Sequence, residues 1–306
     1  RQAPRRPKTG TYSCADPYSP RTRANRAMVL RSIITVVVAL TVGYCALVLM
    51  FWLFQERILF QPSAGPYPVT PGDLDLPWRE IDLHAEDGAR LAAWYVEGPT
   101  ADAPVVLFLH GNAGHMGYRV ERLATFREMG AAAFIIDYRG YGQSEGRPSE
   151  AGVHRDAAAA WQWLTTSAGY SPGRIIVYGR SLGTALAARL AAEHDPGALV
   201  LESAFTSVPE LAGDLYPWLP VRLLARMRFD TAAALAETNA PILLAHSPED
   251  EIIPFEHAQR LRSILPKATE LVRTLGDHNA PTLIASSPYR TALSRHIERL
   301  RASVSE

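Results

Sequence analysis

The pattern of hydrophobic and polar positions divides the chain into regions of different kinds. Residues 1–30 are rich in Arg, Pro and Ser, and such a segment buries too little apolar surface to offset the entropy of ordering. Residues 31–54 are almost entirely apolar, residues 55–77 are Pro-rich, and residues 78–306 alternate between short apolar runs and amphipathic segments. This pattern predicts a disordered basic tail, a transmembrane segment, a linker and a folded domain.

The apolar run from Ser32 to Phe54 contains no charged residue. As a helix it is about 34 Å long at about 1.5 Å per residue, which is enough to cross a hydrocarbon core of about 30 Å. Arg31 and Trp52 stand near its two ends, as is typical of a membrane interface. A cleaved signal peptide is the alternative, but the run is longer than such signals need and no small-x-small cleavage site follows it. We therefore predict an uncleaved signal anchor at residues 31–54.

Charge is distributed unevenly around this anchor, although the net formal charge of the whole chain is zero. Eight basic residues precede the apolar run, whereas Arg57 is the one basic residue among the twenty that follow it. The positive-inside bias predicts a cytoplasmic N-terminus and an extracytoplasmic domain, which is periplasmic if the organism is bacterial. The basic tail either only sets this topology or also contacts anionic lipid headgroups. The remainder of the chain is acidic, and nothing in it suggests binding to nucleic acid.

Short apolar runs and helix-like segments alternate beyond the linker. We expect helices at 117–128, 150–166, 182–193 and 255–264, a last helix that Ser287 caps and Pro288 begins, and strands at 78–83, 91–96, 105–109, 132–136, 174–178, 198–201, 242–245 and 270–275. This alternation predicts an α/β fold with a mostly parallel central sheet of about eight strands flanked by helices. Residues 204–240 interrupt the alternation and are expected to form a short cap.

Composition agrees with a globular domain and limits its chemistry. The chain is 47% hydrophobic and 20% charged, which is ordinary for a globular protein. Only Cys14 and Cys45 occur, and Cys45 lies inside the apolar run, so no disulfide framework is proposed for the folded part. A cysteine metal cluster is excluded by the same count, and no metal or organic cofactor is implied.

The stretch from Ile175 to Leu186 carries the clearest chemical signal. A β-branched run ends at Tyr178, Gly-Arg-Ser-Leu-Gly follows at 179–183, and a segment with good helix propensity comes next. This context predicts a strand, a tight turn and a helix, in which the sharp bend lifts a serine hydroxyl above the sheet edge. Ser181 is therefore the candidate nucleophile. The five-residue pattern alone is a weak signal, because a Gly-rich turn beside a capping Ser has the same letters.

Polar residues also follow the other expected strands, where ligands of parallel sheets bind. His-Gly-Asn-Ala-Gly stands at 110–114 and Tyr-Arg-Gly-Tyr-Gly-Gln-Ser-Glu-Gly at 138–146. Asp250 and His278 follow two later strands. Along the chain a serine, an acid and a histidine therefore come in the order Ser181, Asp250, His278.

This order and these motifs resemble the α/β-hydrolase family, in which the triad runs Ser, then Asp or Glu, then His. The resemblance covers about residues 78–300. The motifs at 110–114, 138–146 and 179–185 together are most similar to the bud-emergence-type branch, which comprises membrane-anchored serine hydrolases with one N-terminal helix. The resemblance implies an α/β-hydrolase fold and a serine hydrolase activity.

The chemistry of acyl transfer assigns a role to each candidate. Serine is a poor nucleophile at its own pKa, so a neutral imidazole must take its proton and a buried carboxylate must orient that imidazole. We assign these roles to His278 and Asp250. The remaining histidines stand at expected strand ends, in loops or on helices, where a turn or a packing role accounts for them.

The choice of acid is less determined than that of the nucleophile. Glu249, Asp250 and Glu251 are consecutive, and Glu202 ends an earlier strand where some members of the superfamily place the acid. Asp250 matches the family spacing best and Glu202 is next. Ser247 stands where the family usually has Gly.

The oxyanion of the reaction needs preorganised donors. The backbone N–H of Leu182 is one because it begins a helix, and the resemblance implies the N–H of Asn112 as the other. Arg139 and Arg180 are candidate substrate anchors, but such residues are more often structural and pair with an Asp or a loop carbonyl.

The sequence as a whole predicts a membrane-anchored serine hydrolase that cleaves carboxylic ester or thioester bonds of a small-molecule or lipid-like acyl substrate. A peptidase or amidase on the same fold and a non-catalytic binding or scaffold protein are the alternatives. The apolar segment at 215–229, with arginines between its apolar residues, is either a helix packed on the core or a lid over an acyl pocket.

Overall fold

The computed structural model describes residues 20–267, 269–281 and 286–302, and these form two units, one up to Leu53 and one from Phe54 onward. The first unit is most of helix α1 (Pro20–Leu59), which is long and apolar enough to be a candidate membrane span. Residues 20–30 are helical, although the sequence predicted a disordered tail there, because the Arg and Ala residues that precede the apolar run are good helix formers. The rest of that predicted tail lies outside the described residues.

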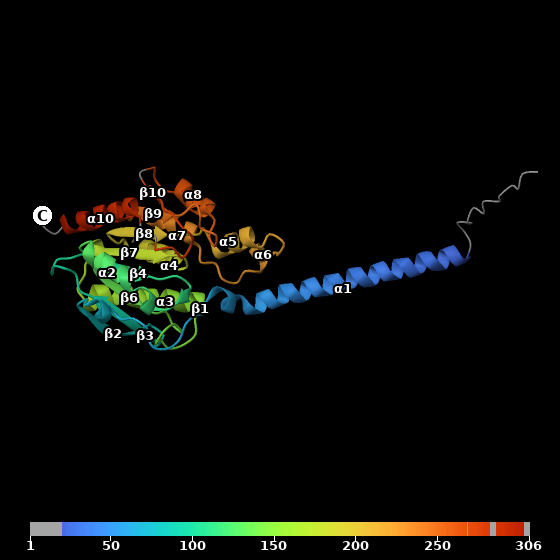
Figure 1. Cartoon of the computed structure of the whole chain (residues 1–306), viewed down its shortest axis with the longest axis horizontal. Coiled ribbons are helices and arrows are strands. Elements are labelled where there is room, and N and C mark those ends of the chain that lie inside the picture. The colour runs from blue at the N-terminus through green and yellow to red at the C-terminus, as the bar shows by residue number, and fades with distance from the viewer. Residues whose placement is uncertain (1–19, 268, 282–285, 303–306) are drawn as a thin grey trace, which may run out of the picture. The chain divides into compact units, whose positions relative to one another are not determined.

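An eight-stranded sheet forms the centre of the second unit, as predicted (Figure 1). Its order is β10-β9-β8-β7-β4-β6-β3-β2, and every pairing is parallel except those of β3 with β2 and β6. The strands are β2 (Trp78–His84), β3 (Arg90–Val96), β4 (Val105–Leu109), β6 (Ala132–Ile136), β7 (Ile175–Arg180), β8 (Ala198–Glu202), β9 (Ile242–His246) and β10 (Glu270–Arg273). The chain has an α/β-hydrolase fold.

Each face of this sheet is covered by helices, which explains why the central strands are apolar without alternation. Residues Val105, Leu107 and Leu109 of β4 join one core cluster, and Val106 and Phe108 join the other. Helices α3 (Glu150–Gln162), α4 (Gly183–His194) and α8 (Phe255–Ile264) pack on the first face, and α2 (Val120–Glu128) and α10 (Ser287–Ala302) pack on the second.

Several element ends differ from the expected ones. Helix α2 begins at Val120, after the 3-10 turn Met116–Tyr118, and α3 gives way to a π-helical turn at Trp163–Ser167. Strand β10 stops at Arg273 because β9, its one neighbour in the described part of the sheet, ends at the paired residue His246. Beyond this point Leu275 is 78% exposed. At the start of α10 the hydroxyl of Ser286, rather than that of Ser287, accepts the capping hydrogen bond.

The segment 55–77, predicted as a linker, is packed onto the second unit. Phe60 is buried against Phe229, and β1 (Gln61–Pro62) pairs with β5 (Ala113–Gly114). The Tyr67 hydroxyl donates to Asp137. A Pro-rich segment can therefore be ordered here because its few apolar and aromatic side chains find buried partners.

The interruption at 204–240 contains three short helices, α5 (Val208–Leu215), α6 (Val221–Leu224) and α7 (Thr231–Glu237). Leu235 of α7 is buried in the core, so this helix belongs to the layer that covers the sheet. Only α5 and α6 have the character of a cap. The Gln55 side chain holds this segment by donating to the carbonyl of Leu224 and accepting from the N–H of Arg226.

Candidate active site

Ser181 occupies a strained turn between β7 and α4. Its φ is +52°, a left-handed conformation that non-glycine residues rarely adopt. The flanking glycines make this turn possible, because a Cβ on Gly179 would lie 2.4 Å from the carbonyl oxygen of Gly183, and a Cβ on Gly183 would lie 2.0 Å from that of Leu109. The Ser181 N–H donates to the carbonyl of Glu202 (2.9 Å), which ties the turn to the end of β8.

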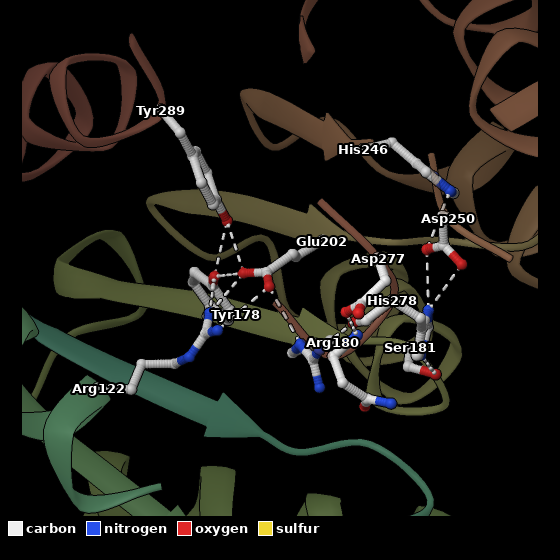
Figure 2. Close-up of polar contacts among 11 residues, drawn as sticks. Arg122, Tyr178, Arg180, Ser181, Glu202, His246, Asp250, Asp277, His278 and Tyr289 are labelled. Atoms are coloured by element: carbon white, nitrogen blue, oxygen red, sulfur yellow. Dashed lines mark hydrogen bonds and ion pairs between the residues drawn. The ribbon is translucent and has the colours of Figure 1, made fainter. Parts of the chain in front are cut away.

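The three predicted triad residues meet at the carboxyl ends of the parallel strands. The Oγ atom of Ser181 lies 3.1 Å from Nε2 of His278, and Nδ1 of the same ring lies 2.8 Å from Oδ2 of Asp250 (Figure 2). All three side chains are buried. A carboxylate only accepts hydrogen bonds, so Nδ1 of His278 carries the proton and Nε2 is left to accept one from the serine.

The Asp250 carboxylate is stabilised in its charged form. Burial alone would raise its pKa, but hydrogen bonds from His246, His278 and the N–H of Ile253 (2.8 Å) outweigh burial and hold the pKa of Asp250 well below its usual range. Oδ1 also accepts from the N–H of Ile252 (3.0 Å). The carboxylate is therefore both ionised and fixed in orientation.

The other acids that the sequence left open have different partners. Glu249 accepts from the N–H of Gly276 (2.8 Å), and Glu251 accepts from the N–H of His278 (2.9 Å). Glu202 is buried and bonds to two arginines on neighbouring elements. Among the described residues, Asp250 is the one of these four acids whose carboxylate bonds to the His278 ring.

The two expected oxyanion donors lie in the turns around Ser181. Leu182 follows the nucleophile with helical backbone angles. A Cβ on Gly111 would lie 3.3 Å from the Ser181 Cβ, so the turn before Asn112 passes beside the nucleophile. Residue Asn112 is held in place, because its carbonyl accepts from the Tyr141 hydroxyl (2.7 Å) and from a backbone N–H, and its side-chain amide donates to the carbonyl of Leu59 (2.9 Å).

The two arginines considered as substrate anchors are tied to acids. Arg139 bonds to Asp156 (2.7 Å) and Asp87 (2.8 Å), and its hydrogen bond to Asp87 lowers the pKa of Asp87 to about 2. Arg180 bonds to Glu202 (3.0 Å). Both therefore have structural partners.

Sequence reasoning missed a buried polar cluster beside this site. Arg122, Tyr178 and Tyr289 all bond to Glu202. The one available signal was Arg122 itself, which stands on the apolar face of α2 next to the buried Leu123. No group of three or more His, Cys, Asp or Glu within the described ranges is arranged to hold a metal ion.

Comparison with known proteins places this geometry among hydrolases. A family model described as serine aminopeptidase, S33, matches residues 100–231. The chain is 37% identical over 265 residues to an uncharacterized protein of Mycobacterium tuberculosis. The matched region covers 85% of this chain and 94% of that protein. It is 34% identical to the alpha/beta hydrolase domain-containing protein WAV2 of Arabidopsis thaliana, over 74% of this chain and 82% of that protein.

Two further similarities are to a lipase and to an esterase. The chain is 32% identical to the lysophosphatidylserine lipase ABHD12 of Danio rerio, over 68% of this chain and 57% of that protein. The esterase Pf2001 of Pyrococcus furiosus has a similar structure, with a TM-score of 0.65 at 19% identity, over 79% of this chain and 99% of that one.

Proposed function

The chain belongs to the α/β-hydrolase family, and we propose that it is a membrane-anchored serine hydrolase that cleaves carboxylic ester or thioester bonds through an acyl-enzyme. The observation that carries this proposal is the chain of hydrogen bonds from Asp250 through His278 to Ser181. A serine held at a positive φ on a glycine-flanked turn, with an imidazole at its hydroxyl, is what nucleophilic catalysis requires.

The proposed reaction has two halves. Ser181 Oγ attacks the acyl carbon while Nε2 of His278 takes the hydroxyl proton, and the Asp250 carboxylate stabilises the imidazolium. The N–H groups of Leu182 and Asn112 bind the oxyanion. The bond to the leaving alcohol or thiol then breaks, and the leaving group takes the proton from Nε2. His278 then takes a proton from a water molecule, which attacks the acyl-enzyme. The bond from the acyl carbon to Ser181 Oγ breaks, Nε2 returns the proton to Oγ, and the carboxylic acid is released.

The relatives favour esters over amides as substrates. The zebrafish relative is a lysophosphatidylserine lipase and the structurally similar archaeal protein is an esterase, which supports an acyl ester as the substrate class. The family model described as a serine aminopeptidase keeps a peptidase as the second candidate.

We further propose that α5 and α6 form a lid over the acyl-binding site. Leu223 is 86% exposed and Trp218 is 52% exposed. Both come after β8 in the chain, and that strand is buried throughout. The lid is bonded to Gln55, which directly follows the apolar run that ends at Phe54. The exposed apolar side chains of the lid and the candidate membrane span in the same chain support a lipid-like acyl substrate.

The serine hydrolase proposal is tested by labelling the full chain, in detergent micelles, with a fluorophosphonate probe. Wild type is expected to react, and Ser181→Ala is expected not to. Ser203→Ala is the matched control, because Ser203 is also buried at a strand end with a φ of +52° and its N–H bonds to Ala245. Absence of labelling in folded wild type would refute the proposal and favour a scaffold role. Acyl esters of graded length, thioesters and anilides then separate an esterase from a peptidase.

A further inference from the structure

Glu202 is a buried carboxylate that joins several elements behind the proposed nucleophile (Figure 2). The parallel register of β7 and β8 places Arg180 directly opposite Glu202, and Nε of Arg180 lies 3.0 Å from Oε1. Arg122 of α2 bonds to both carboxylate oxygens, and the hydroxyls of Tyr178 and Tyr289 donate to Oε2. Burial would raise the pKa of Glu202, but the charges of Arg122 and Arg180 outweigh it and keep the pKa below its usual range.

Arg180 has a second partner that Arg122 lacks. Its Nη2 atom donates to the backbone carbonyl of His278. Arg180 is also the residue immediately before Ser181, so one rigid, buried guanidinium links the nucleophile turn to the residue that carries the imidazole. Arg122 neutralises Glu202 from the opposite side and has no such contact among the hydrogen bonds of the described residues.

The loop that carries His278 is held partly through its backbone groups. It follows an edge strand that ends at Arg273, passes through the exposed Leu275, and turns at Gly276 with a φ of +91°. On the side of the proposed acid, Glu251 accepts from the His278 N–H. Arg180 holds the carbonyl of the same residue from the opposite side. The His278 backbone is thus clamped between an acid and a guanidinium.

We propose that Arg180, oriented by Glu202, is a positioning residue that keeps the His278 imidazole within hydrogen-bond distance of Ser181. This inference rests on the proposed function, since it concerns the same site. A ring that must bridge Ser181 Oγ at 3.1 Å and Asp250 at 2.8 Å tolerates little movement of its backbone. The buried ion pair between Arg180 and Glu202 fixes the guanidinium that holds this backbone.

Two matched variants of the full-length chain test the proposal. Arg180→Gln and Arg122→Gln each leave Glu202 with one guanidinium, but only the first releases the His278 carbonyl. We expect Arg180→Gln to lower kcat on a short-chain ester and the rate of fluorophosphonate labelling by about 10- to 100-fold, the loss typical of a displacement of about 1 Å. KM should change less than about twofold, because the substrate pocket is intact. Arg122→Gln should keep both rates within about threefold of wild type.

Further measurements separate positioning from stability. Thermal unfolding midpoints are recorded for both variants, and we expect similar decreases because each loses one buried ion pair. Arg180→Lys, which keeps the charge and one donor, should recover part of the lost rate, and it replaces Arg180→Gln if the latter does not fold. The far-downfield proton NMR signal of the His278 Nδ1–H bonded to Asp250 should weaken or shift in the Arg180 variants and persist in Arg122→Gln.

Equal rate losses in the two glutamine variants, or an unchanged Nδ1–H signal in the Arg180 variants, would overturn the positioning role. A wild-type chain that folds but does not react with the probe refutes the serine hydrolase proposal instead. In that case the NMR signal still decides whether Arg180 holds His278, because it requires no turnover.

Discussion

Replacement of Asp250 by Asn is expected to abolish most activity while keeping the shape of the site. Oδ1 accepts from the N–H groups of Ile252 and Ile253 and lies 3.0 Å from Nδ1 of His278, whereas Oδ2 lies 2.8 Å from the same nitrogen. In Asp250→Asn the amide oxygen stays with the two backbone N–H groups, because the alternative would oppose donor to donor. The amide NH₂ then faces Nδ1 and stabilises the wrong tautomer, in which Nε2 carries the proton and cannot accept one from Ser181.

The magnitude of this effect follows from the loss of the general base. A wrong-tautomer triad loses about 10⁴-fold in kcat, which corresponds to about 5 kcal/mol of transition-state stabilisation. Glu249→Gln is the matched control. The Glu249 side chain accepts only from the N–H of Gly276 (2.8 Å) among its hydrogen bonds within the described part of the chain, and a glutamine oxygen can accept in the same way. This variant should keep more than about a third of the wild-type activity.

The assay is steady-state hydrolysis of a soluble short-chain ester by the full chain in detergent, with circular dichroism as a check on folding. Retention of more than about a tenth of wild-type kcat in Asp250→Asn would refute the assignment of the acid. So would an equal loss in Glu249→Gln, because the effect would then belong to the loop and not to the tautomer.

Three further predictions concern the nucleophile turn, the buried acid and the lid. Gly183→Ala should lower the free energy of unfolding by about 3 kcal/mol or more in denaturant titrations, because the added Cβ would lie 2.0 Å from the Leu109 carbonyl oxygen. Gly173→Ala is the control, because there is open space around its Cβ, and it should change the free energy of unfolding by less than about 1 kcal/mol. Since the folded-state pKa of Asp250 is lowered, the contribution of its carboxylate to stability should be complete above about pH 4 and be lost as pH falls further. The free energy of unfolding is therefore measured from pH 7 to pH 2 for wild type and Asp250→Asn, and the difference between them should stay constant and then shrink. A difference that grows on acidification would contradict the argument. Leu223→Ser on the exposed lid should raise KM for a long-chain acyl ester presented in vesicles and leave a soluble short-chain ester unaffected; equal effects on both would remove the lid role.

Much of the fold follows from local sequence patterns. Residues 105–109 and 132–136 are short apolar runs, each followed directly by a polar residue, and the two predicted strands match β4 and β6 to the residue. The glycines around Ser181 likewise indicate a sharp turn, because the reason for them is steric and local. Element ends such as that of β10 were less predictable, since a strand ends where its neighbour ends, and that neighbour is distant in sequence.

The site shows the same division between local and distant effects. The sequence by itself determined that a serine, an acid and a histidine follow three of the predicted strands in the order Ser181, Asp250, His278, because polar residues at strand ends are visible in the one-dimensional pattern. It could not determine which of the neighbouring acids bonds to the imidazole ring, or that Glu202 serves two arginines. Those choices depend on strand register and on the path of the loop after β10, which bring together residues about a hundred positions apart. Only tertiary packing places Arg122, Arg180 and Glu202 in one buried cluster, because desolvation and ion pairing act between side chains and leave no periodic signal along the chain.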